Sequence, residues 1–231
     1  MAGETIKTQA LCLSVRPWSK TSHIVSWLTP VGKVTTIVKG AQRPKSAFLG
    51  QYDLNYTCEI LYYARAKGDM HALRECAPVE MREYLRGDVR SLVLSSYFRS
   101  LCENLSPQGP DCEQWLDCLS LSLDNLASSD AHPIAKLLDF ELDILKLMGL
   151  WSGISPEGGS FELRGERKMP VSAETARCLK SPLSEKNLEV LLDAARVIGV
   201  FYAFHVDVST EARRSVLSII AKTIQKRRSA K

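Results

Sequence analysis

The chain has 231 residues, of which 45% are hydrophobic and 24% charged, a composition typical of globular proteins with one large or two modest domains. The longest apolar stretch, near residues 188–206, is interrupted by charged residues, so we expect no membrane span. The first ten residues lack a basic end followed by an apolar core, so no secretory signal is expected either.

The charge is unevenly distributed along the chain. Residues 1–80 carry a net charge of +4, residues 81–210 of −6, and residues 211–231 of +6. This asymmetry indicates an anionic partner held by the two ends. The seven cysteines are scattered and none forms a CxxC pair, which favours a reduced, cytoplasmic protein whose cysteines act as small apolar residues.

The first 80 residues alternate apolar and polar side chains over five short segments, which predicts five strands. The turn at Pro30–Lys33 joins the second and third strands in a hairpin. Five short strands that we take to be antiparallel, with a long loop after the third, favour a small closed barrel such as the OB-fold. The predicted strands cover residues 5–15, 21–28, 33–39, 51–63 and 70–79.

The long loop, residues 40–50, is the most distinctive stretch. It places Arg43 and Lys45 around a proline between two glycine hinges, and it lies in a run without acid from Thr5 to Tyr52. A segment with one sign of charge attracts anions, although a simple solvated basic surface is the alternative. The basic residues of this run that we select as nucleic-acid contacts are Arg16, Lys20, Lys33, Lys39, Arg43 and Lys45.

Aromatic residues offer a second kind of contact. Trp18 and Tyr52 lie beside the basic strands, and bases can stack on such rings for about 1–3 kcal/mol each. For Tyr62 and Tyr63 we expect instead that they fill the barrel or its junction with the helices. The role of Trp18 is left open between these two possibilities.

Beyond residue 80 the apolar spacing becomes helical, which predicts an all-helical second domain over residues 81–231. Pro133 begins a helix with a wide apolar face, which we expect to be central, and Gly149 ends it. Residues 150–171 read as an irregular loop. The predicted helices cover residues 88–105, 111–127, 133–148, 172–179, 184–204 and 210 onward, and Arg213 and Arg214 make a weaker second basic patch.

Motifs of catalysis are missing from the sequence. The fragment VGKVT lacks the upstream glycine and the Ser/Thr of a phosphate-binding loop, and neither GxGxxG nor GxSxG occurs. The four histidines lie far apart, and no pair of carboxylates stands out. We therefore expect a protein that is not an enzyme and needs no cofactor.

The amino-terminal part of the chain resembles the OB domain of the RecO family of bacterial recombination mediators. The hairpin TSHIVSWLTPVGK, the loop VKGAQRPKS and the following QYDLN carry the resemblance, and LLDFELDILKLMGL is similar to a RecO helix. The expected fold class is thus α+β, with an OB barrel followed by a helical domain. The resemblance covers the first 80 residues and residues 133–150 well and is thin elsewhere.

The resemblance implies a role that composition alone cannot supply. RecO proteins bind single- and double-stranded DNA, anneal complementary strands, bind the acidic tail of single-stranded-DNA-binding protein, and act with RecR to load RecA. Two alternatives remain open from the residues themselves. One is a general OB-fold binder of RNA or DNA, and the other is an adaptor whose basic face meets acidic peptides.

One departure from the family concerns metal. Many RecO proteins carry four cysteines after the LMGL helix, whereas residues 151–178 contain only Cys178. One thiolate cannot make a tetrahedral zinc site, so we expect the branch of the family without the metal. The same segment is our candidate for the tail-peptide site, although a mobile surface loop is the alternative. Its apolar and basic residues are Trp151, Phe161, Arg164, Arg167 and Lys168.

Overall fold

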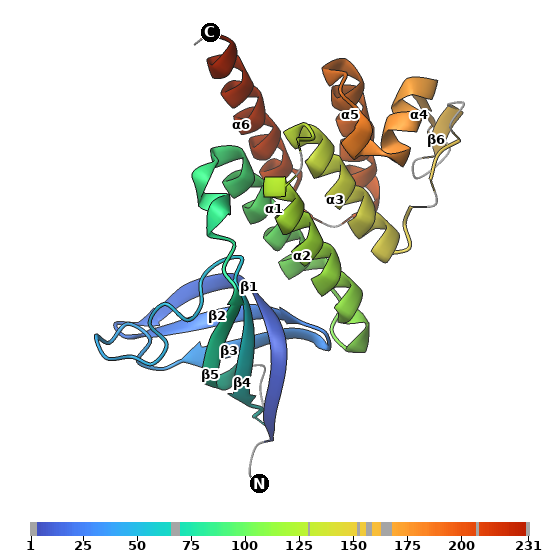
Figure 1. The fold of residues 1–231 in the computed structure, drawn as a ribbon. Coiled ribbons are helices and arrows are strands. Elements are labelled where there is room, and N and C mark those ends of the chain that lie inside the picture. The colour runs from blue at the N-terminus through green and yellow to red at the C-terminus, as the bar shows by residue number, and fades with distance from the viewer. Residues whose placement is uncertain are drawn as a thin grey trace. The chain divides into compact units, whose positions relative to one another are not determined.

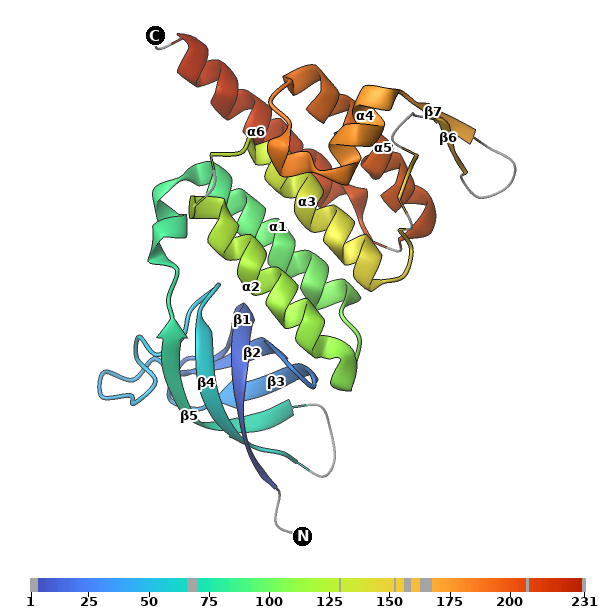
Figure 2. The same cartoon turned by 45° about the vertical axis from the view of Figure 1, so that its right-hand side comes forward.

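The computed structural model describes residues 4–65, 70–128, 130–151, 153–155, 159–162, 168–206 and 208–229. The chain folds into two compact units, drawn in Figures 1 and 2. The first unit comprises residues 1–83 and 98–123, and the second comprises residues 84–97 and 124–231. Two helices, α1 (Val89–Leu105) and α2 (Glu113–Ser128), therefore contribute residues to both units.

The first unit contains the predicted closed barrel of five strands. Its order is β1-β2-β3-β5-β4, and β4 pairs with β1 to close it. The expectation that all strands are antiparallel is wrong at one place, since β3 pairs with β5 in parallel over residues 35–37 and 70–72. The strands are β1 (Thr5–Ser19), β2 (Ser22–Thr29), β3 (Gly32–Val38), β4 (Thr57–Tyr63) and β5 (Met70–Glu80).

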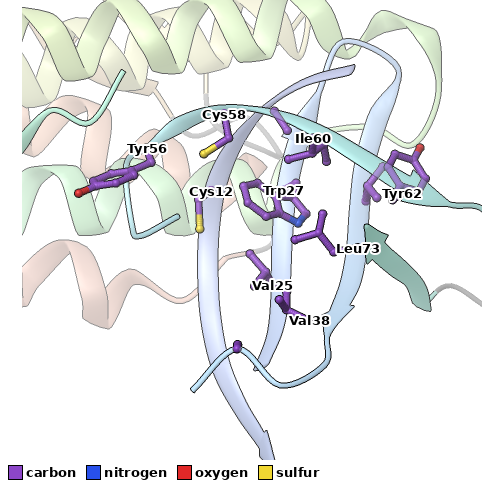
Figure 3. Close-up of a cluster of buried hydrophobic side chains, with 12 residues drawn as sticks. Cys12, Val25, Trp27, Val38, Tyr56, Cys58, Ile60, Tyr62 and Leu73 are labelled. Carbon is purple, nitrogen blue, oxygen red and sulfur yellow. The ribbon is translucent and has the colours of Figure 1, made fainter. Parts of the chain in front are cut away.

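Alternate residues of the strands fill the barrel, as a period of two requires. In β3, Val34, Thr36 and Val38 are buried, and Thr36 accepts a hydrogen bond at 2.9 Å from the indole nitrogen of Trp27. Figure 3 shows Trp27 among side chains from several strands. Tyr62 belongs to this core as expected, whereas Tyr63 is partly exposed and carries the Arg74 guanidinium 4.5 Å from its ring centroid.

The fourth strand was predicted to begin at residue 51, which is earlier than its start in the structure. Residues 51–56 form turns, and the strand starts only at Thr57. The Asp53 side chain accepts a hydrogen bond from the Leu54 amide, and Asn55 has a φ of 70°. Short polar side chains of this kind stabilise turns in place of a ladder.

Two buried arginines donate hydrogen bonds to Asn55, and one of them, Arg99, joins the barrel to the α1 residues of the same unit. Arg99 of α1 donates from Nε to Asn55 Oδ1 at 2.8 Å and also to the main-chain carbonyl of Leu13. Arg82 donates to the Asn55 carbonyl and to Thr57 Oγ1, and it pairs with Glu80 at 2.7 Å. Since both guanidiniums are buried, these contacts satisfy charges that would otherwise be costly.

The second unit is built around α3 (Pro133–Leu147), as expected from its wide apolar face. Nine residues of α3 are buried, and contacts join this helix to α4, α5 and α6. His132 is the N-cap of this helix, and its Nδ1 accepts a hydrogen bond from the Ile134 amide. Gly149, with a φ of 68°, follows the C-terminal end of the helix. The other helices are α4 (Ala173–Lys180), α5 (Leu188–His205) and α6 (Thr210–Ser229), and short 3₁₀ turns cover Glu83–Gly87, Pro110–Cys112 and Pro182–Ser184.

A buried ion pair lies at the centre of this unit. Glu141 of α3 is fully buried, and its carboxylate accepts hydrogen bonds from Arg213 at 2.7 and 2.9 Å and from the Tyr97 hydroxyl at 2.8 Å. The Tyr202 hydroxyl donates to the Glu141 carbonyl. Burial by itself would lower the pKa of Arg213, but Glu141 outweighs that effect, so the net shift is upward. Side chains from α1, α3 and α6 thus meet at one carboxylate.

The segment expected to be an irregular loop contains two short strands. β6 (Gly159–Glu162) pairs antiparallel with β7 (Lys168–Val171), with Phe161 opposite Met169. Neither strand was predicted, because the segment is rich in Gly and Ser and shows no clear alternation. In the part of the chain that the structure describes, no helix has the length and apolar character needed to cross a membrane.

Candidate nucleic-acid interface

The basic loop after β3 is a chain of tight turns. Gly40 and Gly50 have φ values of 69° and 74°, the left-handed region that glycine adopts readily. Main-chain hydrogen bonds connect residue 43 to 40, 46 to 43, 49 to 46 and 51 to 48, at 2.9 to 3.3 Å. The predicted glycine hinges therefore bound a loop that supplies its own backbone partners.

Side chains attach this loop to the barrel at both of its ends. Ala41 is buried, and Phe48 and Tyr52 pack against the barrel core. His23 of β2 lies between the two ends, with its Nδ1 2.8 Å from the Tyr52 hydroxyl and its Nε2 2.8 Å from Gln42 Nε2. These contacts hold both ends of the loop against the barrel, and its charged side chains start from a backbone with defined partners.

The turn between β1 and β2 is bonded to the same loop. The amide of Gln42 donates to the Thr21 carbonyl at 3.2 Å, and the amide of Gly40 donates to Ser22 Oγ at 3.4 Å. These bonds bring Trp18 and Lys20, at the end of β1 and in the turn, to the same end of the barrel as the loop. In OB-folds the loop between the first two strands is one of the loops that bind oligonucleotides.

We call this surface the basic end and define it by four cations and one ring: Lys20, Lys39, Arg43, Lys45 and Trp18. All five side chains are exposed. Within the described residues none of the four cations has an ion-pair partner, unlike Lys7, which pairs with Glu59 at 2.8 Å. Such a group of uncompensated charges on an ordered backbone is suited to bind phosphates.

Two of the predicted contacts have other partners. Arg16 pairs with Glu103 of α1 at 2.8 Å, and Ser14 donates to the same carboxylate. Lys33 donates to the main-chain carbonyl of Glu103 at 2.8 Å, a favourable place for a cation at a helix C-terminus. Lys33 is also distant from the basic loop, because it lies at the start of β3 whereas Lys39 follows the end of this strand, about 20 Å away at the usual rise per residue.

One of the two arginines of the second predicted basic patch is buried. Arg213 is buried against Glu141, so its guanidinium cannot reach a phosphate without breaking a buried ion pair. Arg214 is exposed, and it donates to Thr210 Oγ1 at 3.1 Å. Sequence alone does not show which of these two neighbouring arginines is buried, because that depends on which of the two positions in the helix faces the core.

The predicted tail-peptide segment borders a pocket in the second unit. The pocket has a volume of about 440 Å³, and Trp151 lines it. The Trp151 ring packs against the Phe201 ring in a T-shaped arrangement, with 5.5 Å between the ring centroids. Lys146 and Lys180 also line it, together with Gly153, Ile154, Ala176 and Leu179. Of the other predicted residues, Lys168 is exposed in β7, Phe161 lies in β6, and Arg164 and Arg167 fall outside the described residues.

The described cysteines are not gathered into a metal site. Among the described residues, no group of three or more His, Cys, Asp or Glu side chains is placed to hold a metal ion. Cys178 is buried in α4, and burial together with the nearby Glu185 raises the pKa of its thiol to about 11. At neutral pH this cysteine is therefore a protonated, apolar side chain.

We predict that the purified protein contains well under one zinc ion per chain. Metal analysis measures this directly, and a strong chelator should leave the melting temperature unchanged, because there is no folding energy from a metal to remove. One zinc ion per chain, or a lower melting temperature in chelator, would contradict this prediction.

Two features of the site were not anticipated from sequence. The wide spacing of the four histidines gives no sign that His23 connects both ends of the basic loop. Lys146 and Lys180 were not selected for the pocket, because they lie 34 residues apart and no local motif links them. The only signal for His23 was its place in a strand beside the basic loop.

Comparison with known proteins identifies relatives of both parts of the chain. Residues 1–82 match the family described as "Recombination protein O N terminal". The chain is 29% identical over 147 residues to the DNA repair protein RecO of Alkaliphilus metalliredigens, covering 63% of this chain and 58% of that protein. The RecO of Rhodopirellula baltica is 29% identical over 143 residues, covering 61% and 52%. The RecO of Acetivibrio thermocellus is 24% identical over 204 residues, covering 84% and 78%. The aligned part thus spans little more than half the length of the first two relatives.

Proposed function

Since the chain belongs, through its N-terminal domain, to the RecO family of DNA repair proteins, we propose that it is a DNA-binding recombination mediator that anneals complementary single strands. The observation that supports this proposal best is the basic end, with four exposed cations that have no ion-pair partner among the described residues. The proposed activity is not enzymatic. The protein supplies positive charge and a surface, and base pairing supplies the free energy.

The mechanism follows from the electrostatics of nucleic acids. Two single strands repel each other through their phosphates, and a lysine or arginine that contacts a phosphate releases condensed counterions. Arg43 and Lys45 project from a loop held by its own turns and by His23, and Lys39 directly precedes this loop, so the backbone that carries them needs little ordering on binding. Strands held at this surface would meet at reduced repulsion and at raised local concentration.

The decisive experiment is annealing of complementary oligonucleotides by the purified protein, with and without single-stranded-DNA-binding protein. We expect annealing to be faster with the protein in both cases. Annealing of RNA but not DNA would favour a general RNA-binding function. Binding of acidic peptides without any annealing would favour an adaptor.

We also propose that the pocket beside Trp151 binds the acidic tail of single-stranded-DNA-binding protein. A peptide with an acidic, hydrophobic end needs an apolar cavity with a few cations at its rim. Trp151, Ile154 and Leu179 provide an apolar wall. Lys180 and Lys146 provide the charges, and Lys146 also pairs with Asp143 at 2.7 Å. By the family relationship, RecR and then RecA would act next, and a protein on chromosomal DNA would work at the cytoplasmic nucleoid.

Reversing both charges of this pocket, Lys146→Glu with Lys180→Glu, is expected to abolish measurable binding of the tail peptide, because attraction becomes repulsion at both rim positions. Fluorescence anisotropy of a labelled tail peptide measures the effect. Annealing of bare DNA should survive, since neither lysine belongs to the basic end.

The matched control is Lys186→Glu with Lys222→Glu, which reverses two other exposed lysines of the same unit that do not line the pocket. It should leave peptide binding unchanged. If the double variant of the pocket binds the peptide normally, then Arg164→Glu with Arg167→Glu tests the flanking segment. If the double variants of the pocket and of the segment both bind the tail as the wild type does, neither the pocket nor the segment is the tail site.

A further inference from the structure

One side chain of the basic end has a property that phosphate binding does not explain. Trp18 is 58% exposed, whereas Trp27 is fully buried and Trp115 is 4% exposed. Leaving an indole in water forgoes about 1.5–3 kcal/mol or more of burial energy that a large apolar side chain normally contributes. Among the described residues no aromatic ring or cation packs against Trp18.

The backbone accounts for this exposure. The pairing of β1 with β2 changes register between Pro17, which faces His23, and Ser19, which faces Ser22. Trp18 is therefore the extra residue of a β-bulge and faces no partner on β2. Bulges of this kind re-aim a side chain and are common beside functional sites. The bulge holds the ring at the turn that is bonded to the basic loop through Gln42 and Gly40.

We propose that Trp18 is the residue by which the basic end discriminates single-stranded from duplex DNA, through stacking of an unpaired base on its indole ring. This inference rests on the proposed function and specifies its substrate. The four cations attract phosphates of either form of DNA, because both carry the same charged backbone. Only an unpaired base offers a free face, since the bases of a duplex already stack on each other.

The two kinds of contact predict separable effects. Stacking of one base contributes about 1–3 kcal/mol by alanine substitution, so Trp18→Ala should weaken binding of a short oligothymidylate by about 5- to 150-fold. Binding of closed circular duplex DNA should stay within about twofold of the wild type. The slope of affinity against salt should also be unchanged, because the substitution removes no charge.

The experiment compares wild type, Trp18→Ala and Trp18→Phe with both DNAs. Trp18→Phe keeps a ring and should retain most of the affinity for oligothymidylate. In the wild type, oligothymidylate should quench the tryptophan fluorescence, and the quench should disappear in Trp18→Phe but persist in the control Trp151→Phe.

Equal losses for single-stranded and duplex DNA in Trp18→Ala, unchanged binding of both, or a quench that persists in Trp18→Phe would each overturn the inference. Wild-type protein that binds neither DNA would overturn the proposed function as well. Wild-type protein that anneals strands while Trp18→Ala matches it in every assay would overturn the stacking role alone.

Discussion

Replacing Glu141 with alanine is expected to lower the free energy of unfolding by about 3–5 kcal/mol, the cost of leaving a buried charge without its partner. Arg213 would lose both of its hydrogen bonds to the carboxylate, and the Tyr97 hydroxyl would lose its acceptor. For a chain of this size the melting temperature should fall by roughly 10 °C. Urea unfolding followed by circular dichroism gives the free energy directly.

Two variants test whether the lost pairing is the cause. Asp193→Ala removes an acid from an exposed ion pair with Arg196, and it should change stability by less than about 1 kcal/mol. The double variant Glu141→Leu with Arg213→Met removes both charges, so it should recover much of the loss. A double variant as unstable as Glu141→Ala would mean that packing, and not the unpaired charge, dominates.

The second large effect concerns the basic end. Replacing Lys39, Arg43 and Lys45 together with alanine is expected to weaken binding to single-stranded DNA by about 10²-fold at about 0.1 M salt. The slope of log affinity against log salt should fall by about 2, since each lost phosphate contact removes about 0.7 from it on a single strand. Titrations at several salt concentrations measure both quantities.

A charge-matched control separates local contacts from net charge. Arg177, Lys186 and Lys222 are exposed cations of the second unit, and replacing all three with alanine lowers the net charge by the same amount. This control should bind DNA with nearly unchanged affinity and slope. If the control loses as much as the loop variant, general attraction explains binding. An unchanged slope in the loop variant would place the DNA site elsewhere.

The sequence was sufficient for the α+β class and for most elements. Alternation in β3 and the helical spacing in α3 identify faces that the structure buries, such as Val34 and Val38 in the barrel. The parallel contact of β3 with β5 could not be seen, because it joins residues 35–37 to residues 70–72 and no local pattern encodes it. β6 and β7 were not predicted for a different reason, since strands of four residues are too short to show a period of two.

The site was predicted less completely than the fold. Lys39, Arg43 and Lys45 lie together because one loop carries them, so sequence proximity was enough. Arg16 and Lys33 have the same charge, but Glu103, which lies 70 residues beyond Lys33, engages both. Arg213 shows the same limit, because its partner Glu141 is 72 residues away. A charge can be read from a sequence, whereas its partner depends on the fold.

The unpaired cations of the basic end also imply a trade-off between stability and activity within one loop. Lys39, Arg43 and Lys45 carry like charges on a backbone held by turns, so they repel one another in the free protein. A single nearby acid would reduce this repulsion and stabilise the free protein. A polyanion that binds only the folded state reduces this repulsion instead. At a ligand concentration of 100 times the dissociation constant, such binding adds about 2.7 kcal/mol to the free energy of unfolding. The protein should therefore be most resistant to heat while it holds its ligand, and evolution toward a more stable free form would remove the charges that attract that ligand.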